Sequence, residues 1–471
     1  MLKSIVKNFY NLLFKIVNFG VNIVKVSSGI DELDEILGGG FFPGYIVLIA
    51  GHPGAGKTTL AAAFLYYGAK KHDEPGIYVS FSENKEEFYR HMETLGFDFD
   101  ELEKEGKFMF IEAMTFASKE AISGLIDVIA NTINELDAKR IVLDTVTALI
   151  GVLSPAEARA FLQTTLVKIV KPLKMITYLI ADLPHGSETI GYGFEEFQSD
   201  VVLKMIIERA KGLARRKLVI YKTREMPVPF YEYEFTIGMG GVKIYIPYRR
   251  EIKGSYKPSR ITTGIPELDK MLGGGVFEGS NILISGPSGT GKTTILLNIA
   301  LHQASQGKRV IYISFEESPE QLKTASRMLG YEPEKLDSLM IFSIGPGSVT
   351  PATIYDHYYK VVNEFKPNIV ILDGLSALER FYPKEEYLIL ARNLGLTGKE
   401  RGITTIFSTL YDVMSGEEIG LSTIADTVIA LWFKKDDEKL ARMMGILKMR
   451  GSWHDTAKRR ITFEKGRVVI R

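Results

Sequence analysis

The sequence lacks cysteine entirely, which excludes disulfide bonds, thiolate metal sites and cysteine nucleophiles. It also lacks an excess of either charge, because 58 lysines and arginines balance 57 aspartates and glutamates to a net charge of +1. A near-neutral chain has no global field that attracts nucleic acid. Its one basic cluster, KGLARRK (211–217), is explained by a solvated strand edge. We therefore expect a cytoplasmic protein without a nucleic-acid partner.

A long apolar run is missing as well. Lys7, Lys15 and Lys25 interrupt the most hydrophobic region, so no segment is long enough to span a bilayer, and no small-residue cleavage site indicates a secretory signal. Polar residues recur every three or four positions through 2–26, which predicts an amphipathic helix. Three interpretations stay open: a helix packed on this or a neighbouring subunit, peripheral contact with a membrane surface, and an unpacked extension.

The composition that is present is that of a globular protein, with 45% hydrophobic and 24% charged residues. A length of 471 residues would by itself favour about three domains. An internal repeat overrides that estimate: KVSSGIDELDEILGGG (25–40) aligns without a gap with RITTGIPELDKMLGGG (260–275). The same offset of 235 residues relates Lys57 to Lys292. The predicted parts are an extension over 1–24, a first domain over 25–246, a linker over 247–259 and a second domain over 260–471.

Continuous apolar runs alternate with helical patterns in each copy, as in YIVLIAG (45–51), GIYVSF (76–81) and MITYLIA (175–181). Continuous hydrophobicity indicates strands buried on both faces, hence a mostly parallel sheet flanked by helices. Later runs such as KLVIYKT (217–223) predict that each copy ends in antiparallel strands. The predicted fold class is therefore α/β, with two tandem domains of this kind.

Each copy carries the pattern G-x-x-x-x-G-K-[ST] between an apolar run and a helical pattern: GHPGAGKT (51–58) and GPSGTGKT (286–293). This context is typical of a P-loop, whose backbone N–H groups and helix N-terminus surround phosphates. The lysine is expected on the terminal phosphates and the threonine on Mg²⁺, so we predict ATP with Mg²⁺ in both copies. The predicted loop contacts are Gly54, Ala55, Gly56, Lys57, Thr58, Thr59, Ser288, Gly289, Thr290, Gly291, Lys292 and Thr293.

Asp144 and Asp373 end the apolar runs IVLD and VILD at matching distances from the two P-loops. A carboxylate at the tip of a buried strand beside a P-loop favours Mg²⁺ coordination, whereas an isolated one would more often cap a helix. The predicted metal residues are Thr58, Asp144, Thr293, Glu316 and Asp373.

The stretches YVSFSEN (78–84) and YISFEES (312–318) match each other except in one chemical respect. The second has adjacent Glu316 and Glu317, whereas the first has Ser82 before Glu83. A carboxylate at this sheet edge can orient and deprotonate a water or hydroxyl that attacks the γ-phosphate. The catalytic candidates are therefore Glu316, Glu317 and Glu83, and the first copy lacks one hydrolytic carboxylate. The alternative is a pair of solvated glutamates at a helix start.

Two further clusters match each other and contain Lys222, Thr223 and Arg224 in the first copy and Lys448, Met449 and Arg450 in the second. Two cations separated by one residue at an exposed strand end can act on phosphates of a neighbouring subunit, as an arginine finger does. Basic residues at a strand end are also commonly just solvated, and the residues alone leave both interpretations open.

Together these features resemble the KaiC family of RecA-like ATPases over residues 25–471. The resemblance is carried by the LGGG lead-ins, the P-loops, the adjacent glutamates, the strand-end aspartates and KMRGSWHD (448–455). GYGFEEFQSDVV (191–202) and LSTIADT (421–427) are similar to the family as well.

The resemblance implies two RecA-like P-loop domains in a double-ring homo-hexamer, with ATP held between subunits in both rings. It implies that Glu316 is the base of the second ring, and that the two basic clusters act on the neighbouring subunit's nucleotide. The further nucleotide contacts that it implies are Thr94, Leu329, Arg442, Ser452 and His454, and the implied phosphoacceptors are Ser422 and Thr423.

Several residues depart from the family pattern. Ser82 replaces the first catalytic glutamate, and Arg224 is followed by Glu-Met-Pro-Val where the family has Gly, Thr and His. Glu417 stands in place of a further phosphoacceptor threonine. The chain stops at Arg471, without the long tail that engages KaiA, so we do not expect a KaiA-driven oscillator.

We predict an ATP-hydrolysing, KaiC-like switch that presents a nucleotide-dependent shape to an unknown protein partner, with serine/threonine autophosphorylation as a candidate second activity. One alternative is a DNA motor or recombinase-related ATPase of the RecA/DnaB type, which the absence of a zinc ribbon, a helix-hairpin-helix pattern and a basic-aromatic tract disfavours. The other is a non-hydrolysing scaffold in which ATP only joins subunits.

Overall fold

The computed structural model describes residues 24–113, 119–148, 154, 156–157, 171–183, 190, 195–210, 213–226, 228, 232–246, 259–345, 347, 349–412, 420–436, 439–464 and 467–471. These residues form two compact units, which correspond to the two copies of the repeat. Residues 1–23, which include nearly all of the predicted N-terminal helix, lie outside the described residues, and so do residues 247–258 of the predicted linker. No helix among the described residues is long and apolar enough to cross a membrane.

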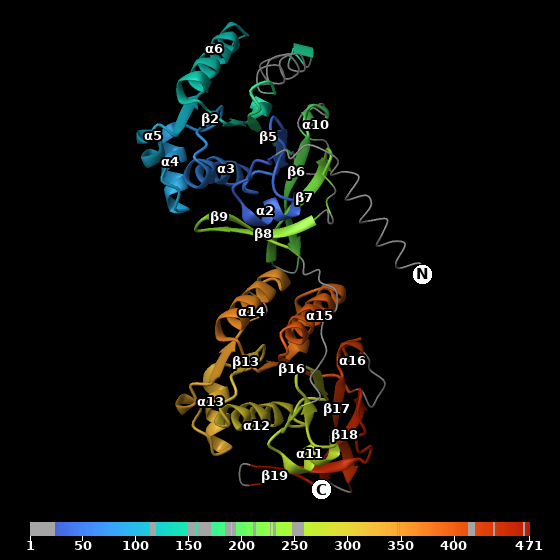
Figure 1. Cartoon of the computed structure of the whole chain (residues 1–471). Helices are drawn as coiled ribbons and strands as arrows, with labels where there is room; N and C mark the ends of the chain where they lie inside the picture. The colour runs from blue at the N-terminus through green and yellow to red at the C-terminus, as the bar shows by residue number, and fades with distance from the viewer. Residues whose placement is uncertain are drawn as a thin grey trace. The chain divides into compact units, whose positions relative to one another are not determined.

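The first unit contains a nine-stranded sheet in the order β3-β2-β4-β5-β1-β6-β7-β8-β9. Its strands are β1 (Ile46–Gly51), β2 (Gly76–Ser80), β3 (Phe108–Glu112), β4 (Arg140–Asp144), β5 (Ile176–Asp182), β6 (Val201–Ala210), β7 (Leu213–Thr223), β8 (Glu232–Gly238) and β9 (Gly241–Tyr245). Its helices are α2 (Asp31–Ile36), α3 (Lys57–His72), α4 (Lys85–Thr94), α5 (Phe99–Lys104), α6 (Lys119–Leu136) and α10 (Glu195–Gln198) (Figure 1).

The second unit repeats this order as β14-β13-β15-β16-β12-β17-β18-β19-β20, beside a two-stranded β10-β11 sheet. The strands are β10 (Arg260–Ile261), β11 (Val276–Phe277), β12 (Asn281–Ser285), β13 (Val310–Ser314), β14 (Leu339–Ser343), β15 (Ile369–Asp373), β16 (Thr404–Thr409), β17 (Thr427–Asp436), β18 (Lys439–Met449), β19 (Arg459–Glu464) and β20 (Arg467–Ile470). The helices are α11 (Pro266–Met271), α12 (Lys292–Ser305), α13 (Pro319–Met328), η2 (Pro333–Lys335), α14 (Pro351–Phe365), η3 (Leu375–Arg380), α15 (Lys384–Glu400) and α16 (Leu421–Ile424).

Both sheets confirm the predicted α/β class, because parallel strands form the centre and antiparallel strands follow. The P-loop strands β1 and β12 pair in parallel on both sides, with β5 and β6 and with β16 and β17. β6 and β17 are therefore the last strands with a parallel neighbour, and the antiparallel part of each sheet begins with the next strand, β7 or β18. Every residue of β1 and of β12 is buried, which explains the continuous apolar runs.

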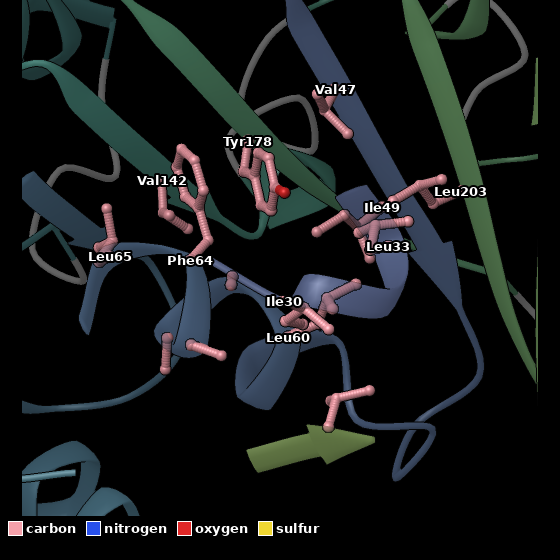
Figure 2. Packing of buried hydrophobic residues seen from close by; sticks show 14 of the residues in the cluster. Ile30, Leu33, Val47, Ile49, Leu60, Phe64, Leu65, Val142, Tyr178 and Leu203 are labelled. Atoms are coloured by element: carbon pink, nitrogen blue, oxygen red, sulfur yellow. The ribbon is translucent and has the colours of Figure 1, made fainter. Parts of the chain in front are cut away.

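Helix α3 fixes the first P-loop against the sheet through its apolar side chains. The ring of Phe64 on α3 stacks on Tyr178 of β5, with centroids 3.9 Å apart (Figure 2). Ile30 and Leu33, at the start of the repeat, are buried in the same cluster as Ile49 of β1. Burial of such side chains stabilises the fold by about 1.5–3 kcal/mol each. The segment that contains Ile30 and Leu33 is therefore part of the core, and this core fixes the position of β1, the strand that leads into the P-loop.

Candidate nucleotide-binding sites

Both P-loops leave the end of a central strand and enter a helix at the lysine. Lys57 Nζ donates to the carbonyls of the first two loop residues at 2.8 and 3.2 Å, and Lys292 Nζ makes the matching bonds at 2.6 and 2.9 Å. The two ammonium groups are thus held over the loop, beside the helix N-terminus where phosphates bind. Burial lowers the pKa of Lys292, while Asp373 and Glu316 raise it.

The last glycine of each loop is required by its conformation and its surroundings. Gly56 and Gly291 have φ angles of 102° and 100°, in the left-handed region. A Cβ on Gly56 would lie 2.4 Å from Ile237 Cδ1, and one on Gly291 would lie 2.2 Å from Phe463 Cζ. Side chains of β8 and β19 therefore close over the loops, and only glycine fits beneath them.

Each P-loop threonine bonds the predicted strand-end aspartate. Thr58 Oγ1 donates to Asp144 at 2.9 Å, and Thr293 Oγ1 donates to Asp373 at 3.0 Å. A hydroxyl and a carboxylate are hard oxygen ligands, and Mg²⁺ beside phosphates is commonly held by one or two such groups. Among the described residues, no group of three or more histidine, cysteine, aspartate or glutamate side chains is placed to hold a metal ion by itself. Each threonine–aspartate pair fits Mg²⁺ that is held jointly with phosphates.

A buried tyrosine of the neighbouring strand orients each of these aspartates. Tyr78 donates to Asp144 at 2.5 Å, and Tyr312 donates to Asp373 at 2.7 Å. In the second unit the other carboxylate oxygen of Asp373 accepts from Ser408 at 2.5 Å. Burial raises the pKa of Asp144, although the bonds from tyrosine and threonine and the charge of Lys57 oppose the rise. The tyrosines were not predicted, yet both begin the matching stretches YVSF and YISF.

The adjacent glutamates lie in a turn that the preceding strand residue holds in place. Ser314 Oγ accepts from the N–H groups of Glu316 and Glu317 at 3.3 and 2.8 Å. Ser80 makes the same two bonds in the first unit at 3.4 and 2.9 Å, and the first of its partners is Ser82. The backbone thus places Ser82 and Glu316 at the same position, and the difference between the sites is in the side chain.

The environment of the glutamates disfavours their charge. Burial is the largest cause that raises the pKa of Glu316, and Asp373 raises it further, whereas Lys292 and Arg380 lower it. Burial, Asp373 and Glu316 raise the pKa of Glu317. A carboxylate whose pKa is shifted toward neutrality is better suited to accept a proton from water.

Glu83 has a similar shift, with burial as the main cause, although His91 opposes it. Asn84 and Ser318, directly after Glu83 and Glu317, cap the helices α4 and α13. The glutamates therefore do stand at helix starts, but in a partly buried site beside an aspartate.

The lysines of the two basic clusters contact backbone in their own unit. Lys222 Nζ donates to two carbonyls within 196–199 at 2.7 and 2.8 Å. Lys448 Nζ makes the matching bonds to Ser422 and Ala425 at 2.6 and 2.8 Å. Each lysine thereby ties the last helix-like segment to the antiparallel part of the sheet.

The arginines of these clusters lie beside a buried aspartate that sequence reasoning missed. Arg224 is 3.2 Å from Asp200, and Arg450 is 3.6 Å from Asp426. Both aspartates also accept the first N–H of the P-loop strand, at 3.0 and 2.9 Å. The arginine side chains are 48% and 49% exposed, so they are held at one end and open to solvent.

The remaining predicted contacts are dispersed. Arg442 Nε donates to the P-loop carbonyl of Gly289 at 2.9 Å, which places it at the second site. Met449 is 6% exposed and packs in the core, so its side chain is a structural one. Ser452 accepts from Arg260, and His454 lies partly buried two residues later.

Thr223, Thr94 and Leu329 make local contacts. Thr223 donates to the carbonyl of Met226 at 2.7 Å. Thr94 ends α4 and donates to the carbonyl of His91 at 2.7 Å. Leu329 follows α13 and packs partly buried on the core.

The candidate phosphoacceptors lie in the short helix α16 and not in the following strand. Thr423 is exposed and donates to the carbonyl of Gly420 at 2.5 Å. Ser422 is partly buried, and its carbonyl accepts from Lys448. Glu417 lies outside the described residues.

Known proteins similar to this chain cover nearly its whole length. A family model described as the ATPase KaiC matches the chain twice, over residues 26–248 and 261–471. A circadian clock oscillator protein KaiC from Picosynechococcus sp. is 31% identical, with 95% of this chain and 90% of that protein covered. Proteins of the same name from Parathermosynechococcus lividus and Synechococcus elongatus are 32% and 31% identical, over 95% and 92% of this chain and 86% of each relative.

Proposed function

The chain belongs to the KaiC family of ATPases, and from this premise we propose that it is a nucleotide-dependent switch whose second domain hydrolyses ATP. The observation that carries the proposal is the repeated constellation of P-loop lysine, threonine and buried aspartate, with an adjacent glutamate pair in the second copy only. The two domains share one scaffold and differ at the position of the proposed base, which is Glu316 in the second domain and Ser82 in the first.

The residues of the second site have separate roles in this proposal. Lys292 and the glycine-rich loop bind the phosphates, while Thr293 and Asp373 would hold Mg²⁺. Bound Mg²⁺ neutralises charge on the phosphates and helps to orient them. Glu316 orients a water and accepts its proton, with Glu317 beside it as the second carboxylate.

The first site is proposed to bind nucleotide without efficient hydrolysis, since Ser82 is no base at neutral pH. Glu83 remains there, at the position that Glu317 has in the second site. This observation also supports a limited version of the scaffold alternative, in which nucleotide in the first domain serves to join subunits.

We further propose a double-ring homo-hexamer, with Lys222, Arg224, Lys448 and Arg450 directed to the nucleotide of a neighbour. The half-exposed arginines support this role, because each is held by a buried aspartate and its side chain still reaches the surface. Autophosphorylation at Ser422 or Thr423, a protein partner, a cytoplasmic location and peripheral membrane contact through residues 2–26 are proposals that rest on the sequence.

One combined experiment tests these points. The full chain is incubated with Mg-ATP while phosphate release, native mass and intact mass are followed. Turnover with an ATP-dependent increase in native mass supports the ATPase ring. Absence of turnover at any assembly state contradicts hydrolysis and favours the scaffold. Salt-dependent binding to single-stranded DNA would instead favour the DNA motor.

A further inference from the structure

The first site contains an ion pair that no part of the predicted machinery explains. Asp182 ends β5, the strand next to the P-loop strand, and its Oδ1 lies 3.2 Å from Lys57 Nζ. The register of the sheet pairs Asp182 with Gly51, the first residue of the P-loop. The carboxylate is 44% exposed and the lysine 9% exposed, so the acid stands at the open side of the lysine.

The second site has leucine at the same place. The N–H of Asp182 donates to Thr147 Oγ1 at 3.0 Å, and the N–H of Leu410 donates to Ser376 Oγ at 3.1 Å. Thr147 and Ser376 both lie three residues after the strand-end aspartate of their unit. The matching bond makes Leu410, the residue directly after β16, the counterpart of Asp182.

The two sites thus place a carboxylate at different strand ends near the P-loop lysine, which is Lys57 in the first site and Lys292 in the second. In the second site the carboxylate of Glu316, which follows β13, acts on Lys292, and the residue that follows β16 is the uncharged Leu410. In the first site the β2 side has the neutral Ser82, and the carboxylate comes from β5 through Asp182.

A P-loop lysine contacts the terminal phosphates when a nucleotide binds. A carboxylate that stays within about one ion-pair distance of that lysine then lies close to the terminal phosphate and repels it. The repulsion grows with the number of phosphates, because ATP extends one phosphoryl group further than ADP. Leucine at the same place carries no charge and has no such effect.

We propose that Asp182 sets the phosphate preference of the first site, so that this site favours ADP over ATP relative to the second site. The inference rests on the proposed binding of nucleotide at the first P-loop. Asp182 acts as a specificity residue, and it gives the first domain a response to the ratio of ADP to ATP.

The test uses the full chain with the substitution Lys292→Ala, which removes the phosphate-binding lysine of the second site. Dissociation constants for Mg-ATP and Mg-ADP are measured by calorimetry with and without Asp182→Asn. We expect the ratio of the ATP constant to the ADP constant to fall about three- to tenfold in the asparagine variant, as screened repulsion near a partly exposed carboxylate allows. Asp100→Asn on α5, which removes an equal charge from an exposed ion pair, should leave the ratio unchanged.

The reciprocal variant tests the same inference at the other site. In a chain with Lys57→Ala, Leu410→Asp should raise the ratio of the two constants at the second site. An unchanged ratio in Asp182→Asn, with both nucleotides still bound, would overturn the role of Asp182 and leave nucleotide binding intact. Loss of all binding in the folded Lys292→Ala chain would overturn the nucleotide site itself, and the inference with it.

Discussion

Replacement of Glu316 by glutamine should abolish most ATP turnover while nucleotide stays bound. Glutamine keeps the size of the side chain and removes its ability to accept a proton. The position leaves little room for rearrangement, because a Cβ on the neighbouring Gly374 would lie 2.8 Å from Glu316 Cγ. General base catalysis contributes about 10²–10⁴-fold to a rate, which corresponds to about 2.7–5.4 kcal/mol of transition-state stabilisation.

The pH dependence of turnover provides a second readout of the same role. Burial and the nearby Asp373 raise the pKa of the Glu316 carboxyl. A base must be ionised to work, so turnover should decrease as the pH is lowered through this raised pKa, at higher pH than for an ordinary glutamate. The residual activity of the glutamine variant should lack that acidic limb. Phosphate release at saturating Mg-ATP over a series of pH values, compared between the wild type and the glutamine variant, measures both effects.

The controls come from the same chain. Glu320→Gln removes a charge that is 77% exposed in the first turn of α13 and should leave turnover unchanged. Ser82→Glu in a Lys292→Ala chain should raise turnover at the first site, because the turn held by Ser80 already has the geometry of the second site. If Lys57→Ala removed most turnover from an otherwise intact assembly, hydrolysis would belong to the first site and the assignment to Glu316 would be refuted.

Three other outcomes follow from the proposals and the packing. Mg-ATP should shift the native mass from small species to a ring, since binding between subunits stabilises the assembly by mass action, and an identical mass without nucleotide would contradict this coupling. Incubation with Mg-ATP should add phosphate at Ser422 or Thr423, as peptide mass spectrometry would detect, and absence of added phosphate after many turnovers would exclude the autokinase and leave the ATPase. Gly68→Ala should lower the free energy of unfolding by about 1–3 kcal/mol, because the new Cβ would lie 2.3 Å from Nε of the fully buried Arg140. Chemical denaturation measures this effect, and Gly124→Ala, with no atom within 4 Å of the new Cβ, is the control that should not lose stability.

The sequence allowed most of the scaffold to be predicted, because its signals are local. Buried parallel strands appear as continuous apolar runs, and a glycine-rich turn before a helix defines a P-loop without knowledge of the rest of the fold. The bonds from Thr58 to Asp144 and from Thr293 to Asp373 join motifs that are 86 and 80 residues apart, a similar spacing in both copies, so their proximity was expected. The missed side chains depend on which strands are neighbours in the sheet, and the chain order does not reveal that.

Asp182 illustrates this limit. It stands directly after the predicted strand 175–181, as Asp144 stands at the end of its own strand, so the same signal was present in the sequence. Its importance depends on β5 lying beside β1, which places the carboxylate against Lys57. Asp200 was missed for a related reason, because its partners Ile46 and Arg224 are far from it in the chain.

Because the two units share a scaffold, the side chains that differ between their sites can be compared directly. The serine that holds the glutamate turn, the threonine–aspartate pair and the hydroxyl under the strand β5 or β16 make the same bonds in both units, within 0.1 Å. These three bonds therefore do not distinguish the two sites. The side chains at two strand ends do, since Ser82 and Asp182 in the first unit correspond to Glu316 and Leu410 in the second. Under the two proposals, a carboxylate at the position of Glu316 accepts the proton of the attacking water, and one at the position of Asp182 weakens binding of the terminal phosphate. One scaffold can in this way combine a site that consumes ATP with a site that reports on its product.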